Sequence, residues 1–231
     1  MTKELQKRII TSAVLLILLI IFNFSKFFGM GVLIFALFIC IEFSELLSKL
    51  VGPGLIKHYR YSSYPEKLNL KYLTLQILAI FYVLIVFGGS SFELHGRFGN
   101  PIFFLFLLSI CFFSDIGGYV IGKSIGGKRL TKISPKKTIS GSIGSFSFSI
   151  LALLLFYNYD QYEYSLSIKN FLFCLIISLA CQLGDLFISY LKRKAKIKDT
   201  GNILPGHGGL LDRVDGIIFA VPFAYLLLKL I

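Results

Sequence analysis

The chain alternates between long apolar runs and short stretches that are polar, basic or rich in glycine. The apolar runs cover about residues 9–24, 27–43, 72–88, 101–122, 141–157, 168–191 and 214–231. A helix needs about 20 residues to cross a hydrocarbon layer of about 30 Å, so the first two runs and the last are short for a span. The pattern predicts an all-α polytopic membrane protein with about seven transmembrane helices, in a range of six to nine.

Composition supports a membrane protein. The 231 residues are 55% hydrophobic and only 16% charged, and the mean hydropathy is +0.77. A soluble protein this apolar would expose large hydrophobic patches. The first run has a basic start like a signal peptide, but no small-residue cleavage site follows it, so we expect a retained span. The four cysteines lie inside apolar runs without a CxxC pair, which favours buried free thiols.

Basic residues predict the orientation of the chain. With a cytoplasmic N-terminus and seven crossings, all but four of the 24 Lys and Arg residues lie in cytoplasmic segments, as the positive-inside rule requires. The four exceptions are Lys26, Arg97, Lys169 and Lys229. Topology therefore explains most of the net charge of +12, and we expect no nucleic-acid partner. Residues 1–100 are predicted to form N-terminal transmembrane helices and residues 101–231 a catalytic region, together one continuous membrane domain.

Two acidic residues interrupt the apolar runs. Asp115 and Asp185 each lie inside a span, at a depth of roughly 20–25 Å from its outer end, near the cytoplasmic edge. An ionisable group at membrane depth is costly, so a functional role is the default interpretation. The alternative is a carboxylate paired with a lysine that fixes helix packing. Ser189 and Lys192 follow Asp185 at helical spacing on one face, and Tyr119 follows Asp115 in the same way.

The string "GGYVIGKS" (117–124) matches the P-loop pattern, but it follows a lipid-type run rather than a strand of a soluble domain. Glycines recur there at every fourth position (Gly118, Gly122 and Gly126), which instead predicts close packing of membrane helices. The next segment, "SPKKTISGS" (134–142), offers lysines and hydroxyl groups to phosphate oxygens. An ordinary positive-inside loop would have the same composition.

The stretch "NILPGHGGLLDRVDG" (202–216) is polar and flexible between two apolar runs. Its glycines allow the backbone to approach a ligand closely. Asp212 and Asp215 follow, and carboxylates beside phosphates are how proteins usually hold Mg²⁺. Asp199 adds a nearby carboxylate, and His207 suits an acid–base role, a phosphate-binding role or a structural one. We hypothesise that Asp185 and Asp212 converge on one Mg²⁺.

Residues 189–216, "SYLKRKAKIKDTGNILPGHGGLLDRVDG", resemble the motif S-x-x-K-R-x4-K-D-x-G-x3-P-G-H-G-G-x-x-D-R-x-D of the CDP-diacylglycerol synthases, also called phosphatidate cytidylyltransferases. Every fixed position is filled. Upstream, "SDIGGYVIGK", "SPKKT" and "QLGDLFIS" are similar to further segments of that family, so the resemblance covers about residues 110–231. Gly118 replaces a usual Ala, and Ser140 stands where many members carry an acidic or amide residue. The chain is also shorter than most bacterial members.

The resemblance implies the reaction CTP + phosphatidate → CDP-diacylglycerol + pyrophosphate, with Mg²⁺ and in some members K⁺. It implies metal ligation by Asp185 and Asp212, with Asp215 close by. We expect a multi-pass protein of the inner (cytoplasmic) membrane, with its active site facing the cytoplasm and a homodimer as its assembly. The expected catalytic residues are Asp185, Asp212, Asp215, Lys192, Arg193, His207 and Arg213. The expected substrate-binding residues are Asp115, Tyr119, Lys123, Ser134, Lys136, Lys137, Thr138, Ser189, Lys198, Asp199, Gly208 and Gly209.

Two other functions compete. The CDP-alcohol phosphotransferases use the same lipid product, but their D-G-x-x-A-R…G-x-x-x-D-x-x-x-D array is absent. An ion transporter or channel would use intramembrane acids as ion sites. It predicts acids near the middle or in the outer half of the membrane, whereas both acids here lie toward the inside.

Overall fold

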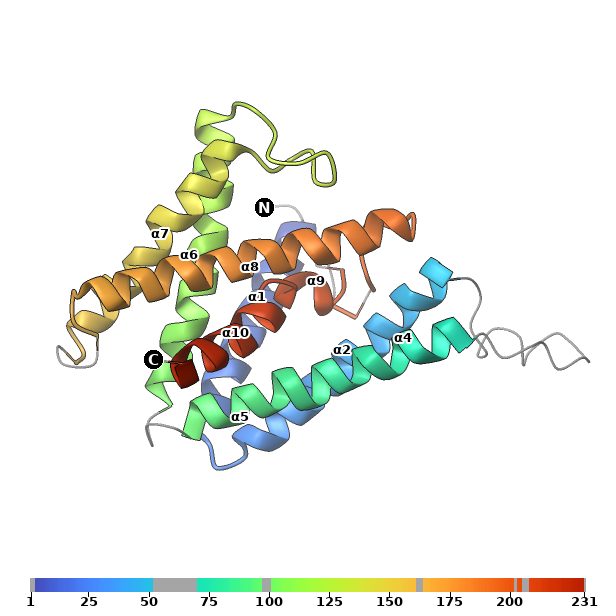
Figure 1. The fold of residues 1–231 in the computed structure, drawn as a ribbon, viewed down its shortest axis with the longest axis horizontal. Coiled ribbons are helices and arrows are strands. Elements are labelled where there is room, and N and C mark those ends of the chain that lie inside the picture. Colours follow the sequence, from blue (N-terminus) through green and yellow to red (C-terminus); the bar gives the residue numbers. More distant parts are fainter. Residues whose placement is uncertain are drawn as a thin grey trace, which may run out of the picture. The chain divides into compact units, whose positions relative to one another are not determined.

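A computed structural model describes residues 3–51, 70–96, 101–160, 164–201, 203–204 and 208–230. Over these residues the secondary structure is helical, apart from two isolated β-bridges in loops. The helices, labelled as in Figure 1, are α1 (Lys3–Phe24), α2 (Phe28–Val51), α4 (Leu70–Phe81), the π-helix η1 (Tyr82–Phe87), α5 (Gly88–Gly96), α6 (Ile102–Ile125), α7 (Ile139–Tyr157), α8 (Ile168–Lys194), α9 (Leu211–Val214) and α10 (Ile217–Leu230).

The predicted all-α polytopic membrane fold is confirmed. Within the described ranges, five helical segments are long and apolar enough to cross a membrane: Phe28–Val51, Leu70–Gly96, Ile102–Ile125, Ile139–Tyr157 and Ile168–Lys194. Two shorter apolar helical segments, Ala13–Asn23 and Ile217–Leu230, account for the first and last apolar runs. The second of these segments contains Pro222, which membrane helices tolerate better than soluble ones.

The chain forms two compact units. Unit 1 comprises Met1–Gly89 and Leu191–Val214, and unit 2 comprises Ser90–Tyr190 and Asp215–Ile231. The polar segment that follows α8 therefore groups with the N-terminal helices. The sequence-based division of one membrane domain near residue 100 stays a prediction.

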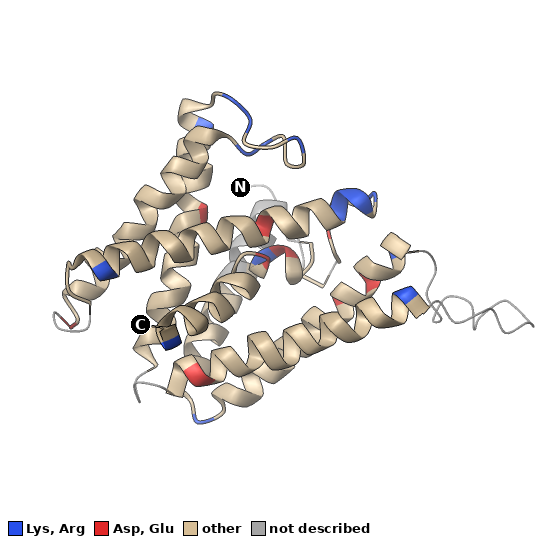
Figure 2. Cartoon of the chain, viewed as in Figure 1, with Lys and Arg blue, Asp and Glu red and all other residues tan. Residues whose placement is uncertain are grey.

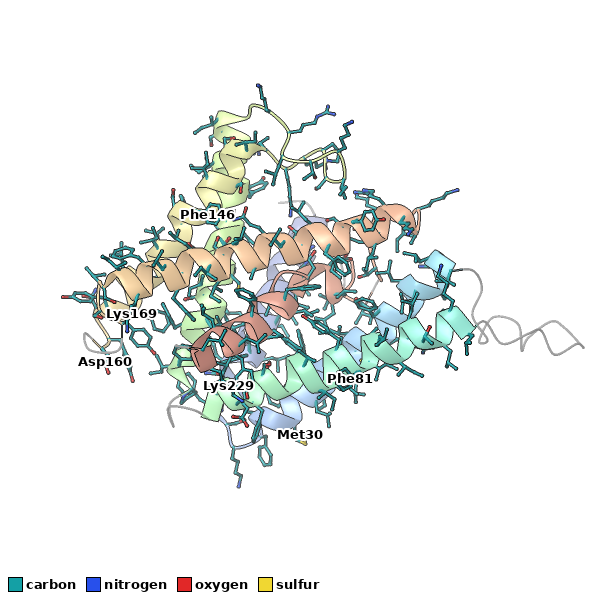
Figure 3. All side chains as sticks on the ribbon, in the orientation of Figure 1. Met30, Phe81, Phe146, Asp160, Lys169 and Lys229 are labelled. Carbon is teal, nitrogen blue, oxygen red and sulfur yellow. The ribbon has the colours of Figure 1, made fainter. Side chains whose placement is uncertain are left out.

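In unit 1, α2 and α4 pack side by side (Figure 1). A polar contact joins them: the Ser44 hydroxyl lies 3.1 Å from the Tyr72 hydroxyl and accepts a hydrogen bond from Gln76 Nε2 at 3.1 Å. Met30 of α2 and Phe81 of α4 project outward (Figure 3) and are 52% and 55% exposed. Large apolar side chains that point away from the protein are typical of lipid-facing helix surfaces.

In unit 2, α6 and α7 pack through glycines. A Cβ atom on Gly117 would lie 2.4 Å from the carbonyl oxygen of Gly144, and one on Gly141 would lie 2.8 Å from that of Gly118. A Cβ atom on Gly118 would also lie 2.6 Å from Ser145 Oγ. Small residues allow membrane helices to approach this closely, as the glycine spacing predicts.

Hydrogen bonds between side chains add a second connection in unit 2. Ser142 of α7 donates to Gln182 Oε1 of α8 at 2.5 Å, and Gln182 Nε2 donates to Ser178 Oγ at 3.3 Å. The Ser178 hydroxyl lies 2.8 Å from the Ser114 hydroxyl of α6. Three helices are thereby linked by polar groups, for which lipid offers no alternative partners.

A polar segment connects α6 to α7. Gly126 ends α6 with a φ of 64°, a conformation that favours glycine, so it does not continue the packing role of Gly118 and Gly122. The backbone then folds back on itself: Leu130 donates to Lys137 O at 2.8 Å, and Ile139 donates to Lys128 O at 3.0 Å. The string that matches a P-loop lies within the last turns of α6, so that interpretation is excluded.

Candidate active site

Asp185 on α8 is paired with Lys137 from the α6–α7 segment. The exposed fractions of these side chains are 29% and 27%. The other carboxylate oxygen of Asp185 accepts a hydrogen bond from Ser189 Oγ at 3.3 Å, one helical turn further along. The folded-back backbone of the α6–α7 segment places Lys137 beside Asp185, so the basic segment is part of this cluster.

Two further acidic residues lie near this part of α8. Asp115 Oδ1 lies 3.9 Å from Cys181 Sγ, and Asp115 interacts electrostatically with both Asp185 and Lys137. The backbone of Asp215 lies close to α8: a Cβ atom on Gly184 would be 2.8 Å from the Asp215 carbonyl oxygen, while Asp215 Oδ1 accepts from Gly216 N at 3.0 Å. Unit 2 thus brings Asp115, Asp185 and Lys137 together, a charge distribution suited to a cation and a phosphate group.

Of the other predicted residues of the basic segment, some form hydrogen bonds within the segment and one is exposed. Thr138 caps α7 by accepting from Gly141 N at 3.1 Å, and Ser134 O accepts from Lys137 N at 3.0 Å in the turn before it. Ser140 donates to the Gly126 carbonyl oxygen and lies 3.0 Å from Thr138 Oγ1, so it stabilises this segment. Lys136 is exposed. Figure 2 shows the basic residues gathered on this segment.

Tyr119 and Lys123 lie on α6 and contact each other. Lys123 Nζ donates to the Tyr119 hydroxyl at 3.4 Å and lies 5.6 Å from the ring centroid. Both side chains are exposed, and the Tyr119 side chain is 67% accessible. The pair therefore offers an ammonium group and a hydroxyl to a ligand.

In unit 1, Asp212 of α9 forms the more buried ion pair. Its Oδ1 atom accepts from Lys192 Nζ at 2.8 Å, and the exposed fractions of the aspartate and lysine side chains are 8% and 11%. Its Oδ2 atom accepts from the backbone N–H groups of Thr200 at 2.8 Å and Gly209 at 3.1 Å. Asp212 therefore holds the preceding loop as well as facing Lys192.

The glycine-rich loop approaches Asp212 closely. Gly208 has a φ of 83°, and a Cβ atom there would lie 3.4 Å from both Asp212 Oδ2 and Asp199 Cβ. Leu204 N donates to the Gly208 carbonyl oxygen at 2.9 Å and closes the loop. The side chains of Arg193, Lys198, Asp199 and Arg213 are exposed around it, while His207 lies outside the described residues.

One residue of this cluster, Glu42 on α2, is absent from the sites predicted from sequence. Its side chain is only 1% exposed and accepts hydrogen bonds from the loop that contains the predicted site residues. The signal was available, because Glu42 is an acidic residue inside an apolar run, as Asp115 and Asp185 are.

A cation would be held by few protein ligands. Within the described part of the chain, no group of three or more His, Cys, Asp and Glu side chains is arranged to hold a metal ion. Mg²⁺ is usually bound by one or two carboxylates together with substrate phosphates. Asp185 and Asp212 lie in different units, and their sharing of one Mg²⁺ stays a prediction.

A known protein family matches the chain over its whole length. The Cytidylyltransferase family matches residues 1–231. A phosphatidate cytidylyltransferase of Rickettsia prowazekii is 39% identical over 183 residues, which cover 77% of each protein. One of Rickettsia conorii is 36% identical over 210 residues, covering 85% of this chain and 87% of the relative. One of Bacillus subtilis is 45% identical over 122 residues, covering 51% and 44%.

The family match includes the segments that carry both ion pairs and the glycine-rich loop, and it agrees with the apolar helical fold. The chain belongs to the cytidylyltransferase family and is an integral-membrane enzyme of the nucleotidyltransferase type.

Proposed function

We propose that this chain transfers the cytidylyl group of CTP to phosphatidate, which forms CDP-diacylglycerol and releases pyrophosphate. A phosphate oxygen of phosphatidate attacks the α-phosphorus of CTP, and the bond between that phosphorus and the β-phosphate oxygen breaks. The observation that carries the proposal is a chain-long family match combined with two lysine–carboxylate pairs on family motif segments. The attacking phosphate is already anionic, so the reaction needs no strong general base.

The chief obstacle is the repulsion between two polyanions. Lys137 and Lys192 each place an ammonium group beside a carboxylate, on polar segments that flank apolar helices. An ammonium group held in position stabilises the charge that develops on transferring phosphoryl groups. We assign phosphate contacts to these two lysines, and a supporting role to the exposed Lys123 and Lys136.

Asp185 and Asp212 are the proposed Mg²⁺ ligands. Carboxylate oxygens are the ligands that Mg²⁺ prefers. The described contacts place Ser189 and Lys137 on separate oxygens of Asp185, and Lys192 on Oδ1 of Asp212 with Thr200 and Gly209 on Oδ2. Acceptor capacity therefore remains on both oxygens of Asp185 and on Oδ1 of Asp212. When bound, Mg²⁺ would neutralise phosphate charge and stabilise the leaving pyrophosphate. K⁺ is a second proposed cation.

The location of the reaction is part of the proposal. Phosphatidate lies in the membrane and CTP is soluble, so the residues that join them belong at an interface. The distribution of basic residues favours the cytoplasmic face of the inner membrane. A homodimer is the proposed assembly.

The proposal is tested with purified protein in lipid nanodiscs, α-labelled CTP and Mg²⁺. With phosphatidate present, label should enter a lipid product as pyrophosphate appears in equal amount. Diacylglycerol in place of phosphatidate should give no product, because it lacks the attacking phosphate. Folded protein that forms no labelled lipid would contradict the proposal, and CMP release from CDP-diacylglycerol with an added alcohol would favour the phosphotransferase alternative.

A further inference from the structure

A buried glutamate on α2 holds the loop that leads to Asp212. Glu42 Oε1 accepts from the backbone N–H of Leu210 at 2.8 Å, and Oε2 accepts from that of Leu211 at 2.8 Å. Oε2 also accepts from Thr200 Oγ1 at 3.1 Å. The exposed fraction of Glu42 is 1%, and that of Thr200 is 0%. All four residues belong to unit 1, although Glu42 is far from the others in sequence.

Two glycines of the loop leave room for this carboxylate. A Cβ atom on Gly201 would lie 2.7 Å from Glu42 Oε1, and the three atoms nearest to it all belong to Glu42. A Cβ atom on Gly209 would lie 2.5 Å from Glu42 Oε2 and 2.2 Å from Thr200 Oγ1. The contact therefore depends on the absence of side chains at both positions, which lie on either side of the loop.

Glu42 and Asp212 hold the same loop through different atoms. Thr200 donates its hydroxyl to Glu42 and its backbone N–H to Asp212 Oδ2. Gly209 donates its backbone N–H to Asp212, while the next two backbone N–H groups go to Glu42. Loss of the Glu42 contacts would therefore release Thr200 and the start of α9, and with them the geometry around the Asp212 carboxylate.

Stability alone is a poor reason for a glutamate at this position. Burial of a carboxylate is costly unless hydrogen bonds compensate it, and an apolar side chain would pack in a membrane helix without that cost. What the glutamate provides, and an apolar residue cannot, is two fixed acceptors for three donors of the loop. The benefit is a defined loop conformation.

We infer that Glu42 is a positioning residue of the cytidylyl-transfer reaction: it fixes the loop so that Asp212 and Lys192 face the reacting phosphates in one geometry. The inference rests on the proposed function. Glu42 acts through the loop and does not itself contact the substrate. A purely structural role would instead lower the amount of folded protein without changing its turnover.

The first test compares Glu42→Gln with Glu45→Gln, a matched control on an exposed position of the same helix. Leu210 and Leu211 donate to different oxygens of Glu42, so the amide NH2 of glutamine would face one of these two N–H groups, donor against donor. Hydrogen exchange, measured by mass spectrometry without substrate, should accelerate in peptides that cover residues 208–214 and stay unchanged in peptides from α6 and α7. Unchanged exchange in the loop peptides would show that the contact is absent.

Kinetics then separate positioning from folding. For folded Glu42→Gln we expect kcat to fall by roughly 10- to 100-fold while KM for CTP changes by less than about threefold, because misplacement of a catalytic group by a small distance affects mainly the transition state. Glu42→Asp keeps the charge and should recover part of the loss. Wild-type kcat in Glu42→Gln, together with faster loop exchange, would overturn the positioning role. Inactivity of the wild type itself would contradict the proposed function. Hydrogen exchange would still test the contact between Glu42 and the loop, because it needs no substrate.

Gly201→Ala gives a second route that does not depend on the folding of Glu42→Gln. The three atoms nearest to the added methyl group all belong to Glu42, so the substitution should lower kcat in the wild-type background and have little further effect in a Glu42→Ala background. Gly89→Ala serves as the control, because a Cβ atom there has nothing within 4 Å. Equal effects of Gly201→Ala in both backgrounds would contradict the inference, since residues that act through one contact are non-additive.

Discussion

Lysine–carboxylate pairs are the central feature at the residue scale. Lys137 with Asp185 and Lys192 with Asp212 bring together residues that are distant in sequence, in units that each have their own apolar core. Helix packing alone is the alternative role of such a pair, as for Asp185. A role in phosphate binding is distinguished from packing by measurements that depend on substrate.

Lys137 and the adjacent Lys136 provide that distinction. The Lys137 ammonium group lies against Asp185, whereas Lys136 is exposed. We predict that Lys137→Ala raises KM for CTP or phosphatidate by roughly 10-fold or more, the loss expected for one charge-assisted contact. Lys136→Ala should change it by less than about threefold. Steady-state kinetics with each substrate varied in turn, at equal amounts of folded protein, provide the measurement.

An unchanged KM for both substrates in both variants would reduce the basic segment to a topology signal. A loss of folded Lys137→Ala protein, with normal KM in the fraction that folds, would instead assign the ion pair to helix packing.

At the element scale, the α6–α7 contact depends on glycine. A Cβ atom on Gly144 would lie 2.5 Å from Ile121 Cβ and 2.7 Å from the Gly117 carbonyl oxygen. Gly144→Ala should therefore force the helices apart and destabilise the protein by about 1–3 kcal/mol, the usual cost of overpacking. Thermal unfolding in detergent should show a lower Tm, whereas Gly89→Ala should not. A wild-type Tm for Gly144→Ala would mean that the helices do not pack as described.

At the C-terminal end of α8, a change to glycine should stabilise the protein. Lys196 has a φ of 56°, and Ile197 N donates to Lys192 O at 3.0 Å, in the pattern that usually places glycine at this position. A non-glycine residue in this conformation costs roughly 1 kcal/mol, so Lys196→Gly should raise Tm by about 2–4 °C. A lowered Tm would show that the lysine side chain contributes more than its backbone conformation costs.

The sequence predicts elements better than it predicts contacts between them. Apolar runs located the spanning helices, and the spacing of Gly118 and Gly122 anticipated close packing, because both signals are local. Gly126 has the same spacing but ends α6 and does not continue this packing, because glycine is also the residue that commonly ends helices. The pairing of Asp185 with Lys137 and the contacts of Glu42 join distant segments, so no local pattern contains them.

At the scale of the whole molecule, the charge distribution predicts which ends face the cytoplasm. Unit 2 has the basic α6–α7 segment at one end and, at the other, Asp160 after α7 and Lys169 in the first turn of α8 (Figures 2 and 3). In a background without the native cysteines, Asp160→Cys should react with an impermeant thiol reagent on intact cells. Lys132→Cys should react only after permeabilisation. The reverse pattern would contradict the predicted orientation.

The most direct test of the central claim, that Asp185 and Asp212 bind Mg²⁺ for cytidylyl transfer, is turnover measured against Mg²⁺ concentration. Asparagine keeps one oxygen, which at position 212 can still accept from Thr200 and Gly209, so the loop should stay folded. Asp185→Asn and Asp212→Asn should each lower turnover by roughly 100-fold or more, because several kcal/mol of charge stabilisation are lost. The exposed Asp199→Asn should lose much less, and Asp160→Asn should match wild type. If Asp185→Asn and Asp212→Asn turn over like wild type at low Mg²⁺, the assignment of these carboxylates is wrong.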